Sequence, residues 1–205
     1  MSERDHKQLS RAAFDRQARD YDHAVCGRHA RRIHGDVMHG VGRFDFSTVL
    51  DVGCGTGTTL AAILDARPGV HALGVDLSSV MIEVAHQRLG TRAELRVADA
   101  EHLPFGDGVV DLVVCVDSLH HYPHPERALH EMRRVTRPGG GLVLGEWRLV
   151  APLRQLMNAL LTRLPEGDVR VYTPRELVDL AAAAGYSAGY CEPAGVRGQL
   201  LVSRR

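Results

Sequence analysis

The stretch Val49-Leu50-Asp51-Val52-Gly53-Cys54-Gly55-Thr56-Gly57 decides the fold, because an apolar, strand-like run leads directly into glycines at alternate positions. A glycine has no Cβ, so its backbone can take unusual dihedral angles and lie directly against a ligand. The pattern predicts a strand followed by a nucleotide-binding turn. The dinucleotide fingerprint of dehydrogenases requires G-x-G-x-x-G, whereas position 58 is Thr and the third glycine arrives one residue early. The spacing therefore argues against NAD.

Four further apolar segments follow this loop, and helix-like segments separate them. They predict strands at residues 70–76, 93–100, 109–116 and 142–147, and helices at residues 58–66, 78–89 and 125–136. Ser78 is a suitable N-cap and Gly90 a suitable helix stop. Strands that alternate with helices predict a parallel sheet with right-handed crossovers.

Both ends of the chain also show regular patterns. Residues 9–40 form a polar-rich helical pattern, and residues 150–164 have apolar side chains at helical spacing, which predicts one apolar face. Thr173 and Pro174 open another helix as N-cap and first-turn proline. Residues 187–203 predict an antiparallel hairpin, because a short turn separates two strand-like runs.

The glycine loop, with Asp51 two residues before its first glycine, resembles motif I of the class I S-adenosylmethionine-dependent methyltransferases. Other landmarks of that family follow in order over residues 47–147, and residues 14–22 resemble its small-molecule, type 11-like members. The resemblance implies S-adenosyl-L-methionine as cofactor. It also implies an α/β fold with a Rossmann-like sheet of seven mostly parallel strands, the last antiparallel, in three α/β/α layers with a helical N-terminal cap.

The chain length suits one such domain. With 205 residues, of which 44% are hydrophobic, it is long enough for one full domain and too short for two large ones. We divide this domain, residues 1–205, into a helical cap (1–45), a cofactor-binding core (46–147), and lid helices with a C-terminal hairpin (148–205).

The expected cofactor site lies at the carboxyl ends of the strands, where open α/β sheets bind their ligands. Asp76 lies 19 residues after Gly57, close to the offset at which an acid meets a ribose. The resemblance places the glycine loop at the methionine part of the cofactor, Asp99 at the adenine amino group, and Val116 near the amino group. The expected cofactor-binding residues are Tyr21, Asp51, Gly53, Cys54, Gly55, Thr56, Gly57, Asp76, Leu77, Met81, Asp99, Ala100, Val116, Asp117, Ser118 and His121.

Three residues are candidates for a general base. His120 and His121 follow the fourth strand, and an imidazole with a pKa near 6.5 is partly neutral at physiological pH. They could instead orient a loop or line the pocket without taking a proton. Glu146, at the end of the fifth strand, is a second candidate, whose alternative role is a hydrogen bond to neighbouring backbone. The aromatic residues Tyr21 and Trp147 could attract the sulfonium through their ring faces, and apolar packing is the alternative for Trp147.

Composition and spacing argue against several other functions. Formal charges balance to zero, which removes the simplest electrostatic argument for a nucleic-acid partner. No apolar run approaches the length of a membrane span, and the N-terminus lacks the apolar segment of a signal peptide. The four cysteines are far apart without a C-x-x-C pair, so we expect reduced thiols in a cytoplasmic protein. The histidines of residues 28–43 recur every five residues and do not converge on one helix face, so no metal site is expected.

The absence of certain motifs favours a small-molecule methyl acceptor. The fourth strand is not followed by the [DN]-P-P-[FY] of enzymes that methylate nucleobase amines, and no Pro-Cys pair supplies an RNA cytosine nucleophile. The apolar face within residues 150–164 suggests a partly apolar acceptor, unless that face packs on the sheet. The alternatives are a polar carboxylate or amine metabolite recruited by arginines of residues 28–43, and a non-catalytic cofactor-binding sensor. The acceptor atom (O, N or C) and the oligomeric state are left open.

Overall fold

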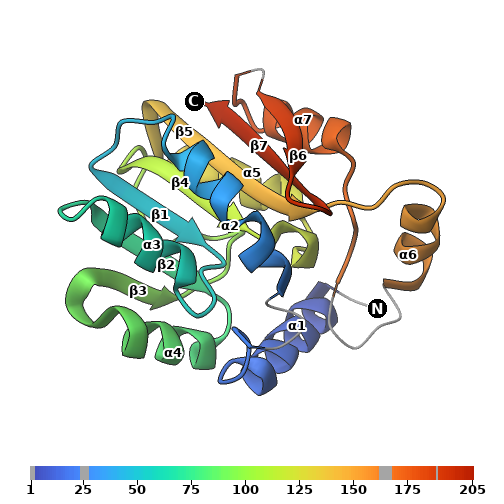
Figure 1. Ribbon diagram of the computed structural model, residues 1–205, viewed down its shortest axis with the longest axis horizontal. Helices are drawn as coiled ribbons and strands as arrows, with labels where there is room; N and C mark the ends of the chain where they lie inside the picture. The colour runs from blue at the N-terminus through green and yellow to red at the C-terminus, as the bar shows by residue number, and fades with distance from the viewer. Residues whose placement is uncertain (1–2, 24–27, 162–167, 188) are drawn as a thin grey trace.

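The chain folds around one sheet of seven strands in the order β3-β2-β1-β4-β5-β7-β6 (Figure 1). The structure is a computed structural model that describes residues 3–23, 28–161, 168–187 and 189–205. The strands are β1 Thr48–Val52, β2 His71–Asp76, β3 Ala93–Val97, β4 Val110–Val116, β5 Thr136–Trp147, β6 Tyr190–Ala194 and β7 Gly198–Arg204. Strands β1 to β5 pair in parallel, and β7 runs antiparallel to both β5 and β6. The predicted fold class is confirmed.

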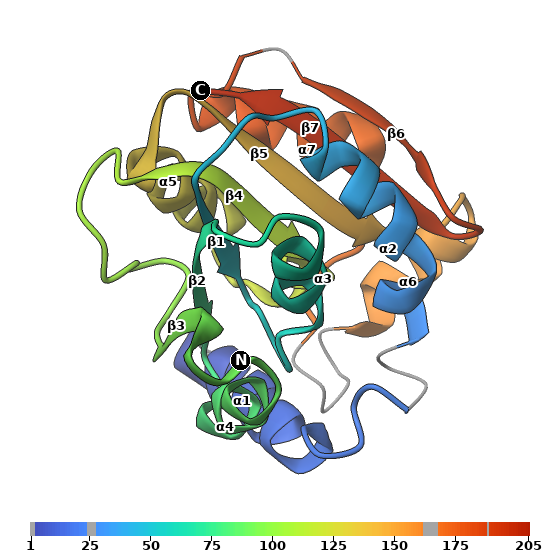
Figure 2. The same cartoon turned by 60° about the vertical axis from the view of Figure 1, so that its left-hand side comes forward.

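Helices cover both faces of the sheet and form the outer layers (Figure 2). The helices are α1 Glu3–Gln17, α2 Arg28–Val41, α3 Thr58–Ala66, α4 Ser79–Leu89, α5 Pro125–Val135, α6 Leu153–Leu161 and α7 Pro174–Ala183. Helices α2, α3 and α4 contribute to one buried cluster, which includes Val49 of β1. Helices α5 and α7 contribute to the other, which includes Leu50. Neighbouring residues of β1 thus face opposite cores, as the alternation of a strand requires.

Local signals in the sequence place the loops that carry the site. Gly53, Gly55 and Gly57 have φ angles of 75°, 51° and 78°, which a residue with a Cβ adopts only at a cost. Ser78 caps α4 by accepting a hydrogen bond from the Met81 amide at 3.1 Å. A capping box at Thr173 opens α7. These turns hold the loops at the carboxyl ends of the strands.

Several predicted boundaries differ from the observed ones. The helical pattern of residues 9–40 divides into α1 and α2, and α2 packs in a sheet-covering layer with only its N-terminal turns reaching the site, so the expected cap reduces mainly to α1. Strand β3 ends at Val97, not at residue 100. Strand β5 begins at Thr136, because a β-bulge against β4 absorbs the glycine-rich turn expected before residue 142. Cys26 and Leu164, included in the predictions above, lie outside the described residues.

The apolar face of α6 does not pack on the sheet. Leu153 is 46% exposed and Leu156 is 59% exposed, and α6 lies at the periphery of the molecule (Figure 1). The alternative in which this face simply packs on the strands is therefore wrong. No helix in the described part of the chain combines the length and apolarity that crossing a membrane requires.

Candidate active site

One cavity gathers the predicted cofactor residues at the carboxyl ends of β1, β2 and β4. Every residue of the predicted set lines it except Gly57. A Cβ at Gly57 would lie 2.9 Å from Leu89 Cδ1, so this glycine lets the loop pack closely against α4. A Cβ at Gly55 would meet no atom within 4 Å, so the space beside that backbone is open to a ligand.

Two carboxyl groups line this cofactor cavity, the buried Asp51 and the half-buried Asp76. Asp76 accepts hydrogen bonds from the amides of Gly55 at 2.9 Å and Ser78 at 2.8 Å. Burial outweighs these bonds and raises the pKa of Asp76 to about 6. Asp51 is 2% exposed, and burial, together with the charge of Asp76, raises its pKa to about 8. The empty cavity therefore disfavours two negative charges, and a cationic ligand would relieve that cost.

Helix α1 covers the cofactor cavity through polar contacts that the sequence pattern did not reveal. The Lys7 ammonium lies 2.8 Å from Asp99 and 3.0 Å from Glu101. The Ser78 hydroxyl donates to Asp15 at 2.5 Å. The Phe14 ring contacts His121 edge-on, with ring centroids 4.8 Å apart. A polar-rich helix with no strong apolar periodicity gives no local signal of the side that faces a site, so Lys7 and Phe14 were not identified in advance.

A second cavity, of about 450 Å³, adjoins the first and contains Trp147 and residues of α6. We call it the acceptor cavity. The residues that line both cavities are Phe14, Tyr21, Asp117 and His121. The Trp147 Nε1 is buried and has no hydrogen-bond partner among the described residues. The volume lies within the range of small-molecule sites, roughly 300–1,000 Å³.

His120 and Glu146 form a buried ion pair behind the junction of the cavities. His120 Nδ1 lies 2.7 Å from Glu146 Oε2, and Glu146 Oε1 accepts hydrogen bonds from the amides of Ser118 at 3.2 Å and Leu119 at 2.8 Å. Burial opposes the charged imidazole, but the Glu146 carboxylate outweighs it and raises the pKa of His120 to about 9. His120 is therefore protonated at neutral pH. Glu146 is 1% exposed and lines neither cavity. Its hydrogen bonds to backbone amides match the alternative role predicted for it, not that of a base.

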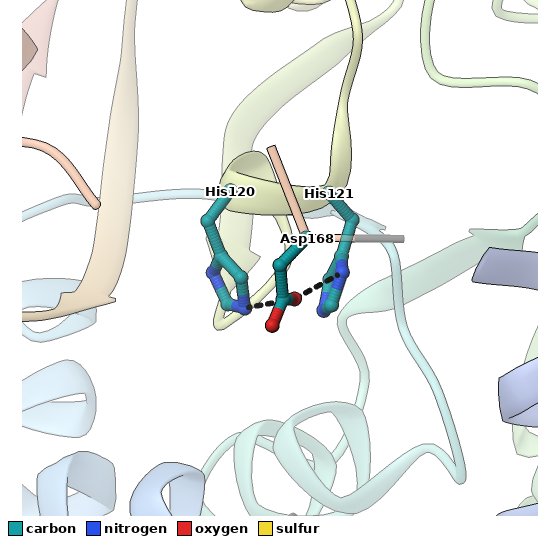
Figure 3. A group of neighbouring side chains, drawn as sticks. All are labelled: His120, His121 and Asp168. Carbon is teal, nitrogen blue, oxygen red and sulfur yellow. Dashed lines mark ion pairs between the residues drawn. The ribbon is translucent and has the colours of Figure 1, made fainter. Parts of the chain in front are cut away.

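His121 differs from its neighbour and faces Asp168 (Figure 3). Its Nδ1 lies 2.8 Å from Asp168 Oδ1 without hydrogen-bond alignment, and His120 Nε2 lies 3.8 Å from the same oxygen. Burial and the charge of His120 lower the pKa of His121, so this imidazole is neutral at physiological pH. Although burial opposes it, the contact with His121 holds the pKa of Asp168 below its usual value. Asp168 comes from a segment without a periodic pattern, so it was not predicted as a site residue.

His120, His121 and Asp168 each offer one atom that could bind a metal ion, and these atoms lie within 4.8 Å of one another. The charges of His120 and Asp168 account for this proximity, because an imidazolium attracts a carboxylate. That the protein works without a metal ion stays a prediction.

Comparison with known proteins agrees with this arrangement. Residues 50–144 match the family model described as a methyltransferase domain. Malonyl-[acyl-carrier protein] O-methyltransferase of Geobacter sulfurreducens is 40% identical over 187 residues, which cover 86% of this chain and 69% of the relative. Methyltransferase GfsG of Streptomyces halstedii is 35% identical over 134 residues, 63% of this chain and 46% of the relative. The chain thus spans less than half the length of some curated relatives.

Solved structures show the same fold. A SAM-dependent methyltransferase from Aquifex aeolicus superposes with a TM-score of 0.67 at 21% identity, covering 82% of this chain and 89% of that one. PigF with SAH superposes with a TM-score of 0.71 at 22% identity, covering 87% of this chain and 56% of that one. Since the Geobacter relative is matched over more than two thirds of its length, the chain belongs to the S-adenosylmethionine-dependent methyltransferases.

Proposed function

We propose that this chain transfers a methyl group from S-adenosylmethionine to a small, partly apolar metabolite, on oxygen, nitrogen or carbon, by in-line displacement. The observation that carries the proposal is the junction of the two cavities at Phe14, Tyr21, Asp117 and His121. A cofactor in the first cavity and an acceptor in the second would meet there. The bound cofactor would supply an electrophilic methyl group: an electron pair of the acceptor oxygen, nitrogen or carbon would form the new bond to the methyl carbon, the carbon–sulfur electron pair would stay on sulfur, and a proton of the acceptor would be lost before or after the transfer.

Positioning supplies much of the rate in this proposal. Holding two reactants in attack geometry contributes roughly 7–11 kcal/mol when the geometry is well maintained. The cover by α1 also excludes water, because Phe14 and Tyr21 close the junction with aromatic rings 6.1 Å apart. Little further catalysis is needed for an acceptor that already carries a lone pair.

An acceptor that must lose a proton requires a base, and we assign that role to His121. It is neutral and lines both cavities, whereas His120 is protonated and paired with Glu146. A nearby carboxylate would stabilise the imidazolium that His121 becomes, and Asp168 lies beside it. His120 and Glu146 then act by holding the turn that carries His121.

The names of several relatives support a small or carrier-bound acceptor. They include a malonyl-[acyl-carrier protein] O-methyltransferase, a demethylmenaquinone methyltransferase and a 27-O-demethylrifamycin SV methyltransferase. A probable tRNA methyltransferase 9B of mouse also matches, over 22% of its length. The zero net charge of this chain disfavours a nucleic-acid acceptor.

The test is formation of S-adenosylhomocysteine with a panel of quinones, phenols and organic acids, followed with wild-type protein and His121→Asn. We expect the variant to bind the cofactor normally and to lose about 10²- to 10⁴-fold in rate with an acceptor that must be deprotonated. His86→Asn, in an exposed position on α4, is the matched control. An unchanged rate in His121→Asn would exclude His121 as base. Cofactor binding without turnover on the whole panel would favour the non-catalytic sensor.

A further inference from the structure

The acceptor cavity carries an excess of positive charge, although the whole chain is neutral. Two acidic residues, Asp117 and Asp168, line it among the residues that the structure describes, and both have imidazole partners. Both oxygens of Asp117 lie 2.7 Å from His29 Nδ1, and this contact, against the effect of burial, raises the pKa of His29. Asp168 lies between His120 and His121.

Two arginines of this cavity, Arg32 and Arg197, have no such partner. Within the described ranges, neither guanidinium makes a hydrogen bond or an ion pair. Both residues are exposed at the mouth of the cavity. A local positive region on a neutral protein is a feature of that site, and it raises the local concentration of anions.

Specific backbone contacts hold these arginines near each other. Arg32 belongs to α2, and Arg197 belongs to the turn between β6 and β7. That turn is fastened to α2, because the Gly195 amide donates to Asp36 at 2.8 Å. The Arg197 carbonyl lies 3.1 Å from His29 Nε2. The backbone positions of the two arginines are therefore set by the fold.

The same cavity has an apolar side. Leu153 and Met157, one turn apart on α6, line it together with Leu149. Leu153 remains 46% exposed, so this surface is available to a ligand. Cations at the mouth and an apolar wall suit a ligand with a charged head and an apolar body.

We propose that the methyl acceptor is an amphipathic anion, whose carboxylate or phosphate head binds Arg32 and Arg197 while its apolar body lies against α6. This inference rests on the proposed function, because it assigns the acceptor of the same site. An amphipathic anion combines two features that the sequence analysis treated as alternatives, a partly apolar acceptor and recruitment by arginine. Guanidinium groups suit this role, because their planar donors match the oxygens of carboxylates and phosphates.

The test uses Trp147, the only tryptophan of the chain, as a fluorescent reporter in the cavity. Octanoate, octyl phosphate and octan-1-ol share one apolar body and differ in the head. Each is titrated into the protein with and without S-adenosylhomocysteine. We expect at least one anion to bind about tenfold more tightly than octan-1-ol, because a hydrogen bond between a guanidinium and an anionic oxygen is stronger than one to a neutral hydroxyl. The preferred anion identifies the head group.

The variants Arg32→Gln, Arg197→Gln and their combination should lose this preference and keep the affinity for octan-1-ol. Arg175→Gln, an exposed arginine of α7 that pairs with Asp179, should behave as wild type. Equal binding of all three probes, no response to either anion, or an unchanged preference in the double variant would overturn the proposal.

Calorimetric titration of the same samples with S-adenosylhomocysteine separates this inference from the proposed function. Failure to bind S-adenosylhomocysteine would contradict methyl transfer itself, whereas normal binding without head-group preference would contradict only the anionic acceptor. The titrations without S-adenosylhomocysteine test the arginines in either case.

Discussion

Binding of S-adenosylmethionine should release protons near neutral pH, because two carboxyl groups with raised pKa values line the cofactor cavity. The pKa of Asp51 rises from 3.8 to about 8 through burial and the nearby Asp76, whose own pKa rises to about 6. In the empty protein, the stability contribution of Asp51 is fully present below pH 3.8 and is lost as the pH rises through about 8. Ionising this carboxyl in the empty cavity therefore costs stability.

The size of the effect follows from those pKa values. Each pH unit between the unfolded and folded pKa costs about 1.4 kcal/mol, so full ionisation of Asp51 costs on the order of 5 kcal/mol. The cofactor carries two positive charges, on its sulfonium and its ammonium, and one negative charge, on its own carboxylate. A nearby positive charge lowers the pKa of a carboxyl group of the protein. Near pH 7, binding should release roughly one proton per cofactor, and affinity should rise up to about tenfold per pH unit between about 6 and 8.

The assay is isothermal calorimetry in phosphate and Tris, whose ionisation enthalpies differ, so that the difference in heat gives the number of protons released. Asp51→Asn should abolish most of the release, while Asp65→Asn, which removes an exposed carboxylate paired with Arg92, should not. S-adenosylhomocysteine, which lacks the sulfonium charge, should release fewer protons. Equal heats in both buffers, with an affinity that does not change between about pH 6 and 8, would refute this reasoning.

Four further substitutions test other parts of the site. Gly55→Val should abolish cofactor binding, because its side chain would fill the open space beside the loop, and it should also lose stability, because the φ of 51° strains a residue with a Cβ. Gly53→Ala should unfold at lower denaturant concentration, because φ is 75° there and the Cβ would lie 1.9 Å from Ser118 Oγ. Normal cofactor binding by Gly55→Val, or wild-type stability of Gly53→Ala, would contradict these expectations. Glu146→Gln should reduce the free energy of unfolding by about 3–5 kcal/mol, because it leaves the His120 imidazolium buried without its carboxylate. That loss should be larger at pH 6 than above the His120 pKa of about 9, because the stability that this raised pKa contributes is lost as the pH rises past it. Denaturant titrations at both pH values measure the loss, and a larger loss at the higher pH would contradict this assignment. Lys7→Met removes the ion pairs that link α1 to Asp99 and Glu101 and should speed cofactor release in stopped-flow experiments, and an unchanged rate would show that these contacts do not control release.

The core and the cofactor side were predictable because their signals are local. Asp51, Asp76 and Asp99 each stand at or just beyond the end of an apolar segment, and parallel strands bring their carboxyl ends to one edge of the sheet. The φ angles of Gly53 and Gly55 are positive, a conformation that glycine adopts at much lower cost than other residues. The boundaries of β5 were not predictable, because a bulge depends on the pairing with β4 and not on the residues of the turn.

The sequence by itself thus determined the sheet, the glycine loop and most of the cofactor cavity. Only the tertiary structure decided the acceptor side: the cover by Lys7 and Phe14, the contact of His121 with Asp168, and the placement of Arg32 beside the β6–β7 turn. These side chains come from segments far apart in the chain and carry no shared periodicity. Their meeting depends on how helices and turns dock around the strand ends, and single polar contacts between distant segments leave no pattern in a sequence.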